Sequence, residues 1–245
     1  MPNCRALLLG PDPPPPRLGP CETLWVPLHA AIPVSASHAR AVAAAGASDY
    51  VALTSPRAAR ALAGDAASHG SLGLLREALA SARVAAVGPV TAAEAERLLG
   101  ARVQAVAEPH TGEALGRLLL RLGAGRVAWL RGDPAGSGLR RILLGAGVEL
   151  VEVLVYRLVP TGRLGEALEA LGSVDYVALT SPSIAEALAP GLRGPGGPRV
   201  VAIGPTTASR ARGLGVRVDC VASPHTLEGV GACINLLETA GAIGA

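Results

Sequence analysis

The eight residues Asp49 to Pro56, DYVALTSP, recur unchanged as Asp175 to Pro182. The second copy begins 126 positions after the first, at residue 175 instead of 49. Chance alone does not produce an identical octapeptide at such a distance in a chain of 245 residues. The chain therefore contains two copies of one supersecondary unit, which predicts two similar lobes. Two facing lobes are a common way to form a ligand cleft.

The repeat continues well beyond the octapeptide. In each copy the matching segments indicate the order strand, long connection, strand, helix, strand, helix, short strand, helix. Strands that alternate with helices in this way predict an α/β fold with parallel sheets and right-handed crossovers. The further matching pairs are RVAAVGPVT at 83–91 with RVVAIGPTT at 199–207, PHT at 109–111 with PHT at 224–226, and RALLL at 5–9 with RVAWL at 126–130.

Local signals place the ends of the elements. The short apolar runs at 50–53 and 176–179 are typical of strands that are covered on both faces. Each run is followed by Thr-Ser-Pro, which predicts a helix with serine as its N-cap and proline as its first residue. Two longer extended stretches, 23–34 and 148–160, exceed what a compact lobe needs. We expect them to pass between the lobes, paired as a two-stranded ribbon.

Composition excludes several function classes. All 22 basic residues are Arg, so the chain has no lysine for a Walker A loop or a Schiff base. The chain has no Phe, two Trp and three Tyr, which supplies few stacking platforms for single-stranded nucleic acid. The net charge is only +3 and the Arg residues are scattered, which favours solvated helix faces over a nucleic-acid surface.

The cysteines and the hydropathy bear on compartment. The four cysteines show no CxxC and no Cys/His spacing for a metal, so we expect structural thiols rather than zinc ligands or disulfides. The amino-terminal residues lack the charged and apolar regions of a signal peptide, and no apolar run reaches the ~18 residues of a membrane span. These features predict a soluble cytoplasmic protein without membrane contact.

The repeated TSP and Gly-Pro-x-Thr motifs suggest where a ligand binds. In open parallel sheets, ligands bind beyond the carboxyl ends of the strands, where both motifs fall. Each motif offers free backbone N–H groups, the positive end of a helix dipole and a hydroxyl, which together bind anions without lysine. The alternative is that each hydroxyl only caps a helix. The hydroxyls belong to Thr54, Ser55, Thr91, Thr180, Ser181, Ser183, Thr206 and Thr207.

A few other residues are candidates for chemistry. No GxSxG motif or Cys/His pairing predicts a nucleophile. His110 and His225 lie in matched segments, and we expect them to help start helices rather than to bind a metal. Arg131 precedes a Gly-Asp turn and is a possible carboxylate contact. Tyr156 lies in the long extended stretch, either as a core residue or as a phenol that reaches the ligand and donates a proton.

In this order and spacing, the motifs resemble those of uroporphyrinogen-III synthases. The resemblance implies two flavodoxin-like α/β lobes with parallel sheets, joined by a two-stranded β ribbon. It implies a discontinuous first lobe, 1–33 plus 161–245, a second lobe at 35–149, and linkers at about 24–34 and 150–160. The motifs that carry the resemblance are DYVALTSPR at 49–57, VGPVT at 87–91, LRG at 130–132, VEVLVYR at 151–157, YVALTSPS at 176–183 and AIGPTT at 202–207.

The resemblance also implies an activity. The family converts hydroxymethylbilane, a linear tetrapyrrole with eight carboxylates, into uroporphyrinogen III for haem, sirohaem and cobalamin. The reaction expels water and inverts ring D, without cofactor or metal. It implies a monomer that receives its substrate from hydroxymethylbilane synthase, with Tyr156 as a general acid. The residues expected to bind substrate are Thr54, Ser55, Pro56, Arg57, Gly88, Thr91, Arg131, Gly132, Ser181, Pro182, Ser183, Gly204, Thr206 and Thr207.

Two other functions remain open at this point. A non-catalytic, two-lobed cytoplasmic binding protein for a polyanionic metabolite is the second hypothesis, since it also fits the repeated anion sites. A glycosyltransferase-like enzyme fits two nucleotide-binding-type lobes, but 245 residues is short for that class and no carboxylate-lined nucleotide pocket is evident.

Overall fold

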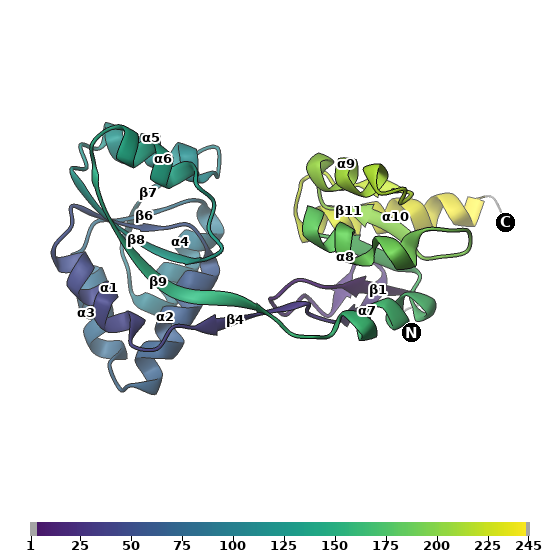
Figure 1. Ribbon diagram of the computed structural model, residues 1–245, viewed down its shortest axis with the longest axis horizontal. Coiled ribbons are helices and arrows are strands. Elements are labelled where there is room, and N and C mark those ends of the chain that lie inside the picture. Colours follow the sequence, from purple (N-terminus) through teal and green to yellow (C-terminus); the bar gives the residue numbers. More distant parts are fainter. Residues whose placement is uncertain (1–3, 244–245) are drawn as a thin grey trace. The chain divides into compact units, whose positions relative to one another are not determined.

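The computed structural model describes residues 4–243 of the chain, which divide into two compact units (Figure 1). Unit 1 combines residues 1–30 with 160–245, and unit 2 comprises residues 31–159. The ends of the expected first lobe, 1–3 and 244–245, lie outside the described residues. The chain crosses between the units twice, within strand β4 (His29–Pro33) and at the end of strand β9 (Glu149–Pro160).

Unit 2 is built around a six-stranded sheet of order β4-β9-β8-β5-β6-β7. Strands β9, β8, β5, β6 and β7 run parallel to one another. Because β9 pairs with β8 from Glu149 to Arg157, most of β9 belongs to this sheet. Its other elements are α1 (Ser37–Gly46), β5 (Tyr50–Leu53), α2 (Pro56–Ser68), α3 (Leu72–Ser81), β6 (Val84–Ala86), α4 (Pro89–Leu99), β7 (Val103–Val106), α5 (Gly112–Arg121), β8 (Arg126–Asp133) and α6 (Gly138–Gly145).

Unit 1 has a six-stranded sheet of order β12-β11-β10-β1-β3-β2, in which only the short β2 is antiparallel. Its elements are β1 (Arg5–Leu8), β2 (Arg17–Leu18), β3 (Cys21–Trp25), α7 (Leu164–Ala170), the 3-10 turn η1 (Leu171–Ser173), β10 (Tyr176–Leu179), α8 (Pro182–Leu192), β11 (Arg199–Ala202), α9 (Pro205–Gly213), β12 (Cys220–Val221) and α10 (Leu227–Ile243).

The two sheets share one plan. The sequence repeat matches β5, β6, β7 and β8 with β10, β11, β12 and β1, and in both sheets these strands occupy the same relative order. In unit 2 the four matched strands follow one another along the chain as β5, β6, β7 and β8. In unit 1 the counterpart of β8 is β1, so it comes first in the sequence instead of last. The predicted α/β class with parallel sheets is confirmed.

The predicted helix starts are also confirmed. The Ser55 hydroxyl accepts a hydrogen bond from the backbone N–H of Arg57 at 3.1 Å and caps α2. Ser181 caps α8 in the same way, by accepting from the backbone N–H of Ile184 at 3.3 Å. Proline follows each cap as the first residue of the helix, where a backbone N–H would have no hydrogen-bond partner within the helix.

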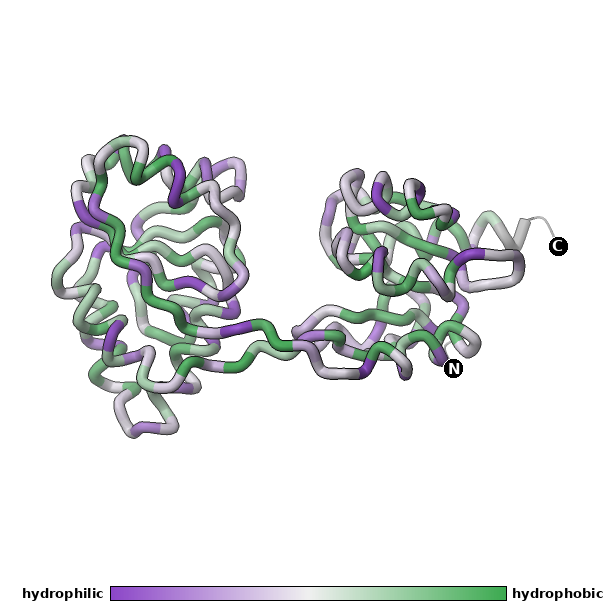
Figure 2. The backbone as a smooth tube through the Cα atoms, viewed as in Figure 1, coloured by the Kyte–Doolittle hydropathy of each residue, from purple (hydrophilic) through white to green (hydrophobic). Residues whose placement is uncertain are grey.

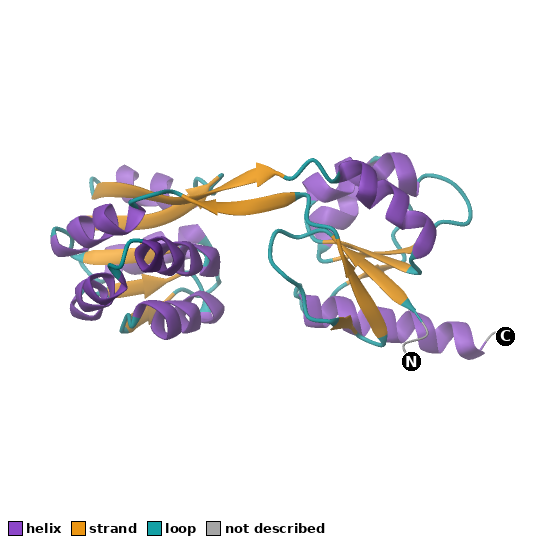
Figure 3. Cartoon of the chain, turned by 90° about the horizontal axis from the view of Figure 1, so that it is seen from below, coloured by secondary structure: helices purple, strands orange, loops and turns teal. Residues whose placement is uncertain are grey.

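The central strand β5 of unit 2 is buried on both faces of its sheet, so its sequence does not alternate between apolar and polar residues. In β5, Val51 and Leu53 pack into the core beneath α1 to α4, whereas Tyr50 and Ala52 pack into the core beneath α5 and α6. Figures 1 and 3 show helices on both faces of this sheet, and Figure 2 shows the apolar strands between them. Because both faces are covered, every residue of β5 is apolar.

The expectation of free structural thiols is wrong. Cys4 is joined to Cys21, and Cys220 to Cys233, in two disulfides within unit 1. The register of the parallel pair β1 and β3 places Arg5 opposite Glu22, so the preceding residues Cys4 and Cys21 come together. The second bond ties β12 to α10. Neither pairing follows from local spacing, because each depends on how distant elements meet.

Candidate active site in unit 2

Unit 2 has a cavity of about 620 Å³ at the carboxyl edge of its sheet. Its lining comes from the segments that follow β5, β6, β7 and β8, and from β8 and β9 themselves. This is the edge at which open parallel sheets bind ligands. The lining residues are Thr54, Ser55, Pro56, Arg57, Val87, His110, Thr111, Gly112, Glu113, Trp129, Gly132, Pro134, Ala135, Gly136, Gly138, Leu139 and Tyr156.

The Tyr156 phenol lies at the first turn of helix α2. Its hydroxyl donates a hydrogen bond to the Ser55 hydroxyl at 3.2 Å. Ser55 is in turn held by the backbone N–H of Arg57, so both hydroxyls are fixed relative to the helix. Tyr156 lines the cavity although the residue is only 4% exposed. A buried phenol held beside a cavity is well placed to deliver a proton to a bound molecule.

Gly132 makes room for that phenol. A shift of register between Arg131 and Gly132 pairs Gly132 of β8 with Tyr156 of β9. A Cβ atom on Gly132 would lie 2.5 Å from Cε1 and Oη of the tyrosine, far inside contact distance. The position therefore requires glycine for a packing reason, because only a hydrogen fits beneath the ring.

Trp129 forms part of the cavity wall and was not expected from the sequence. Its indole N–H donates to the Thr54 hydroxyl at 2.9 Å, and the guanidinium groups of Arg131 and Arg140 lie 5.7 and 5.9 Å from its ring centre. Both arginines bind Glu152, each through bonds of 2.6 Å. The hydrogen bond from Arg140, reinforced by Arg131, holds the pKa of Glu152 below its usual value despite burial.

His110 and Glu113 also line the cavity without having been predicted there. The expectation that His110 starts a helix is wrong in detail, because Thr111 is the residue that caps α5, by accepting from the backbone N–H of Ala114 at 3.1 Å. The His110 ring instead bonds the carbonyl of Ala107 at 2.8 Å. The duplicated Pro-His-Thr motif was the available signal for this residue.

The structure brings six of the predicted residues together around the cavity and places three others of unit 2 elsewhere. Arg131 is bound by Glu152 and by the carbonyl of Gly132 instead of lining the cavity. Gly88 packs against His110. Thr91 is 3% exposed, because its place in the first turn of α4 turns it inward, so its hydroxyl does not face the cavity. The six are Thr54, Ser55, Pro56, Arg57, Gly132 and Tyr156.

The remaining predicted residues lie at the corresponding edge of unit 1. Ser181 and Ser183 share a hydrogen bond of 2.9 Å at the start of α8, where Pro182 is the first helical residue. Gly204 is the N-cap of α9, and Thr206 is exposed in its first turn. Thr207, the counterpart of Thr91, is likewise buried at 4% exposure. Its hydroxyl therefore does not serve as a surface anion contact.

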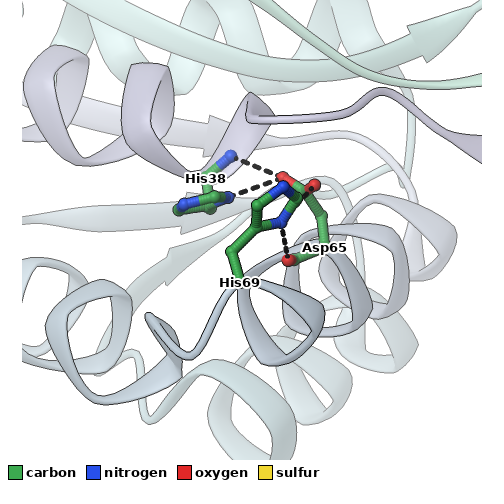
Figure 4. A group of neighbouring side chains, drawn as sticks. All are labelled: His38, Asp65 and His69. Carbon is green, nitrogen blue, oxygen red and sulfur yellow. Dashed lines mark hydrogen bonds and ion pairs between the residues drawn. The ribbon is translucent and has the colours of Figure 1, made fainter.

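One group among the described residues has ligand spacing for a metal, namely His38, Asp65 and His69 (Figure 4). The Asp65 carboxylate already accepts hydrogen bonds from the backbone N–H groups of Ala36 and His38, at 3.0 and 2.9 Å, and from Ser37 and the His38 ring. These bonds satisfy the start of α1, which no side chain of its own caps. We interpret the group as a helix cap supplied from α2.

Comparison with known proteins adds family evidence. The model of the family described as uroporphyrinogen-III synthase HemD matches residues 18–231. A mutant uroporphyrinogen III synthase from the extremely thermophilic bacterium Thermus thermophilus is 23% identical, with a TM-score of 0.61 over 97% of this chain and 98% of that chain. The uroporphyrinogen-III synthetase of Helicobacter pylori is 20% identical, with a TM-score of 0.67 over 96% of this chain and 99% of the other.

The two structural likenesses support the fold, and the family match supports the family. A search of curated proteins found no match. Within residues 4–243, no helix combines the length and the apolar character that crossing a membrane requires.

Proposed function

This chain belongs to the uroporphyrinogen-III synthase family, and we propose that the cavity of unit 2 binds part of its linear tetrapyrrole substrate. The observation that carries the proposal is the Tyr156–Ser55 hydrogen bond, which holds a phenol at the wall of a cavity at the ligand-binding edge of the sheet. The family's reaction is the cyclisation of hydroxymethylbilane to uroporphyrinogen III with inversion of ring D. One molecule of water leaves for each macrocycle closed.

Tyr156 serves this reaction as a general acid. Loss of the terminal hydroxyl is easier when a proton reaches its oxygen as the C–O bond breaks, because water then leaves instead of hydroxide. The phenol supplies that proton. The substituted carbon of ring D that first attacks the electrophile carries no hydrogen. After ring D is inverted, its previously unsubstituted α-carbon forms the last bond of the macrocycle and loses its proton, so the tyrosinate recovers a proton within one turnover.

Positioning provides the rest of the catalysis. The electrophile that forms on loss of the hydroxyl also closes without an enzyme, but to the I isomer in which ring D is not inverted. The enzyme must therefore hold the chain in the geometry from which ring D attacks through its substituted carbon. The positive end of the helix dipole at the start of α2, together with Thr54 and Arg57, suits the substrate carboxylates at this edge.

The interpretation as a non-catalytic binding protein is not favoured, because the family match covers most of the chain. We further propose that the chain acts as a cytoplasmic monomer and takes its unstable substrate from hydroxymethylbilane synthase. Sedimentation of the purified chain tests whether it is a monomer. A coupled assay tests the transfer of substrate: a catalytically inactive protein that binds free substrate is added in increasing amounts, and direct transfer should leave the rate unchanged.

The activity is tested with hydroxymethylbilane generated in the assay. The purified chain is added, the product is oxidised, and the I and III isomers of uroporphyrin are resolved by chromatography. We expect the III isomer to dominate. If only the I isomer of spontaneous closure forms, while a known synthase gives the III isomer in parallel, the proposed function is wrong.

A further inference from the structure

His110 is built into the cavity wall by two features of the backbone. Its Nδ1 atom lies 2.8 Å from the carbonyl oxygen of Ala107, and a carbonyl can only accept, so Nδ1 carries a proton. Gly88 lies against the ring, and a Cβ there would approach Cγ of His110 to 3.2 Å. The backbone of Gly88 is extended, a conformation open to any residue. The missing side chain at Gly88 therefore serves the position of the imidazole.

The same construction occurs in unit 1. The Nδ1 atom of His225 lies 2.8 Å from the carbonyl oxygen of Ala222, and Gly204 packs against the ring. Gly204 matches Gly88, and His225 matches His110, in the sequence repeat. A ring that is oriented in the same way at the ligand-binding edge of both sheets is a feature of the repeated unit, rather than of one loop.

The charges around His110 favour an anionic ligand. With Nδ1 bound to the carbonyl, Nε2 is the nitrogen left to meet a ligand, and no bond from it is formed within residues 4–243. A protonated imidazole offers Nε2–H as a donor to a carboxylate. The one carboxylate in the cavity lining belongs to Glu113, which is already paired with Arg117 and Arg141. Arg57 adds a cationic group to the same lining.

We infer that His110 is a carboxylate-binding residue of the cavity, oriented by Ala107 and by the space left at Gly88, and that His225 has the same role in unit 1. The inference rests on the proposed function only in that the substrate is the source of the carboxylates. It adds an imidazole to the helix dipole and the hydroxyls as the means of binding them.

The test measures binding apart from catalysis. The octacarboxylate uroporphyrin III is titrated by fluorescence into the wild-type chain and into the His110→Gln variant, with a tetrapyrrole of four carboxylates as a second probe. We expect the variant to bind the octacarboxylate about tenfold more weakly and the tetracarboxylate with less loss, in keeping with one charge-assisted hydrogen bond. His69→Gln, on the surface near α1, is the control for loss of a histidine.

A double-mutant cycle tests how the ring is positioned. Gly88→Ala should weaken binding of the octacarboxylate in the wild-type background and change nothing further in His110→Gln, because its effect passes through the imidazole. Gly64→Ala, in α2 with open space around the added Cβ, is the control and should leave binding intact.

The outcomes separate the two proposals. Equal binding by wild type and His110→Gln, or additive losses in the cycle, overturns the inference and leaves the proposed function standing. Formation of only the I isomer by the wild type overturns the proposed function, whereas the porphyrin titration still decides whether His110 binds a carboxylate.

Discussion

The ring of Tyr156 lies against the backbone of Gly132 on the neighbouring strand, where a hydrogen is the only side chain that fits. The shift of register before Gly132 creates this pairing, and the Ser55 hydroxyl fixes the other end of the ring. The position of the phenol is therefore set by a strand and a helix together. Ser55 and Gly132, which lie far apart in the sequence, together fix the ring of Tyr156.

Gly132→Ala should move the phenol without removing it. The added methyl group overlaps the ring, so Tyr156 must leave its hydrogen bond to Ser55. A displacement of about 1 Å costs roughly 100-fold in rate, and we expect kcat to fall by about that factor while the circular dichroism spectrum is unchanged. Gly145→Ala, on α6 with open space around it, is the control. Full activity in Gly132→Ala would show that the phenol needs no fixed position.

Tyr156→Phe should remove the proton donor and leave the packing. General acids contribute roughly 10²–10⁴-fold to rates, so we expect kcat to fall by at least ~10²-fold with little change in KM. The lost hydrogen bond to Ser55 should lower the free energy of unfolding by only about 1 kcal/mol. Steady-state kinetics and urea denaturation measure the two effects. Unchanged turnover would assign Tyr156 to the core alone.

Ser55→Ala and Ser181→Ala form a matched pair. Each removes the cap of a helix that starts with the same sequence, so each should lower the free energy of unfolding by about 1 kcal/mol. Only Ser55 also holds the phenol, so only its variant should lose kcat. We expect Ser181→Ala to raise KM instead, as a substrate contact in unit 1. Equal kcat losses in both variants would contradict a special link between Ser55 and Tyr156.

Asp65 should make the fold sensitive to acid. Burial alone raises the pKa of its carboxyl, but the hydrogen bonds from His38, Ser37 and Ala36 outweigh it and lower the pKa from 3.8 to about 2. A lowered pKa stabilises the fold above about pH 4, and this contribution is lost as the pH falls towards 2. The shift corresponds to roughly 2 kcal/mol.

Urea denaturation between pH 5 and pH 2 measures this contribution. The wild type should lose roughly 2 kcal/mol more than Asp65→Asn over that range, because the amide has no proton to gain. The variant should also be less stable at pH 7, since it removes an acceptor from the start of α1. Parallel curves for the two proteins would mean that Asp65 is not the titrating group.

The disulfides predict a response to reductant. The bond between Cys4 and Cys21 closes a loop of 17 residues, and loops of that size contribute about 3 kcal/mol in the chain-entropy account. Cys21→Ser should lower the free energy of unfolding by about this amount. Dithiothreitol should destabilise the wild type more than it destabilises the variant, as followed by guanidinium titration. An identical response of both proteins would mean that the Cys4–Cys21 bond is not formed in solution.

Local signals carried most of what the sequence predicted about the fold. The strands at 50–53 and 176–179 and their serine caps follow from neighbouring residues alone, and they match the structure to the residue. The disulfides depend on the register between β1 and β3 and on the contact of α10 with β12, which local spacing does not encode.

For the candidate site, too, the sequence predicted what neighbouring residues determine and missed what depends on the pairing of distant elements. The hydroxyls of Thr54 and Ser55 line the cavity, because local sequence places them at the end of a strand. Thr91 and Thr207 carried the same chemical signal, but the rotation of their helices turns them inward. The meeting of Tyr156 with Ser55 depends on a one-residue shift between β8 and β9. Trp129 has no motif of its own, and the duplicated Pro-His-Thr motif marks His110 without indicating binding. The place of both residues in the cavity wall is defined only by the folded strands.

The permuted order of unit 1 has a consequence for synthesis on the ribosome. β1 must pair with β10, and Ala6 lies beside Tyr176, so the amino-terminal strands emerge long before their partner exists. Every strand pair of unit 2 from β5 to β9 forms within a continuous stretch and is available first. The nascent chain therefore carries β1 and β3 with an unpaired edge while the inserted unit completes itself. A pulse-proteolysis experiment on stalled chains should find unit 2 protected while residues 4–25 are still cut.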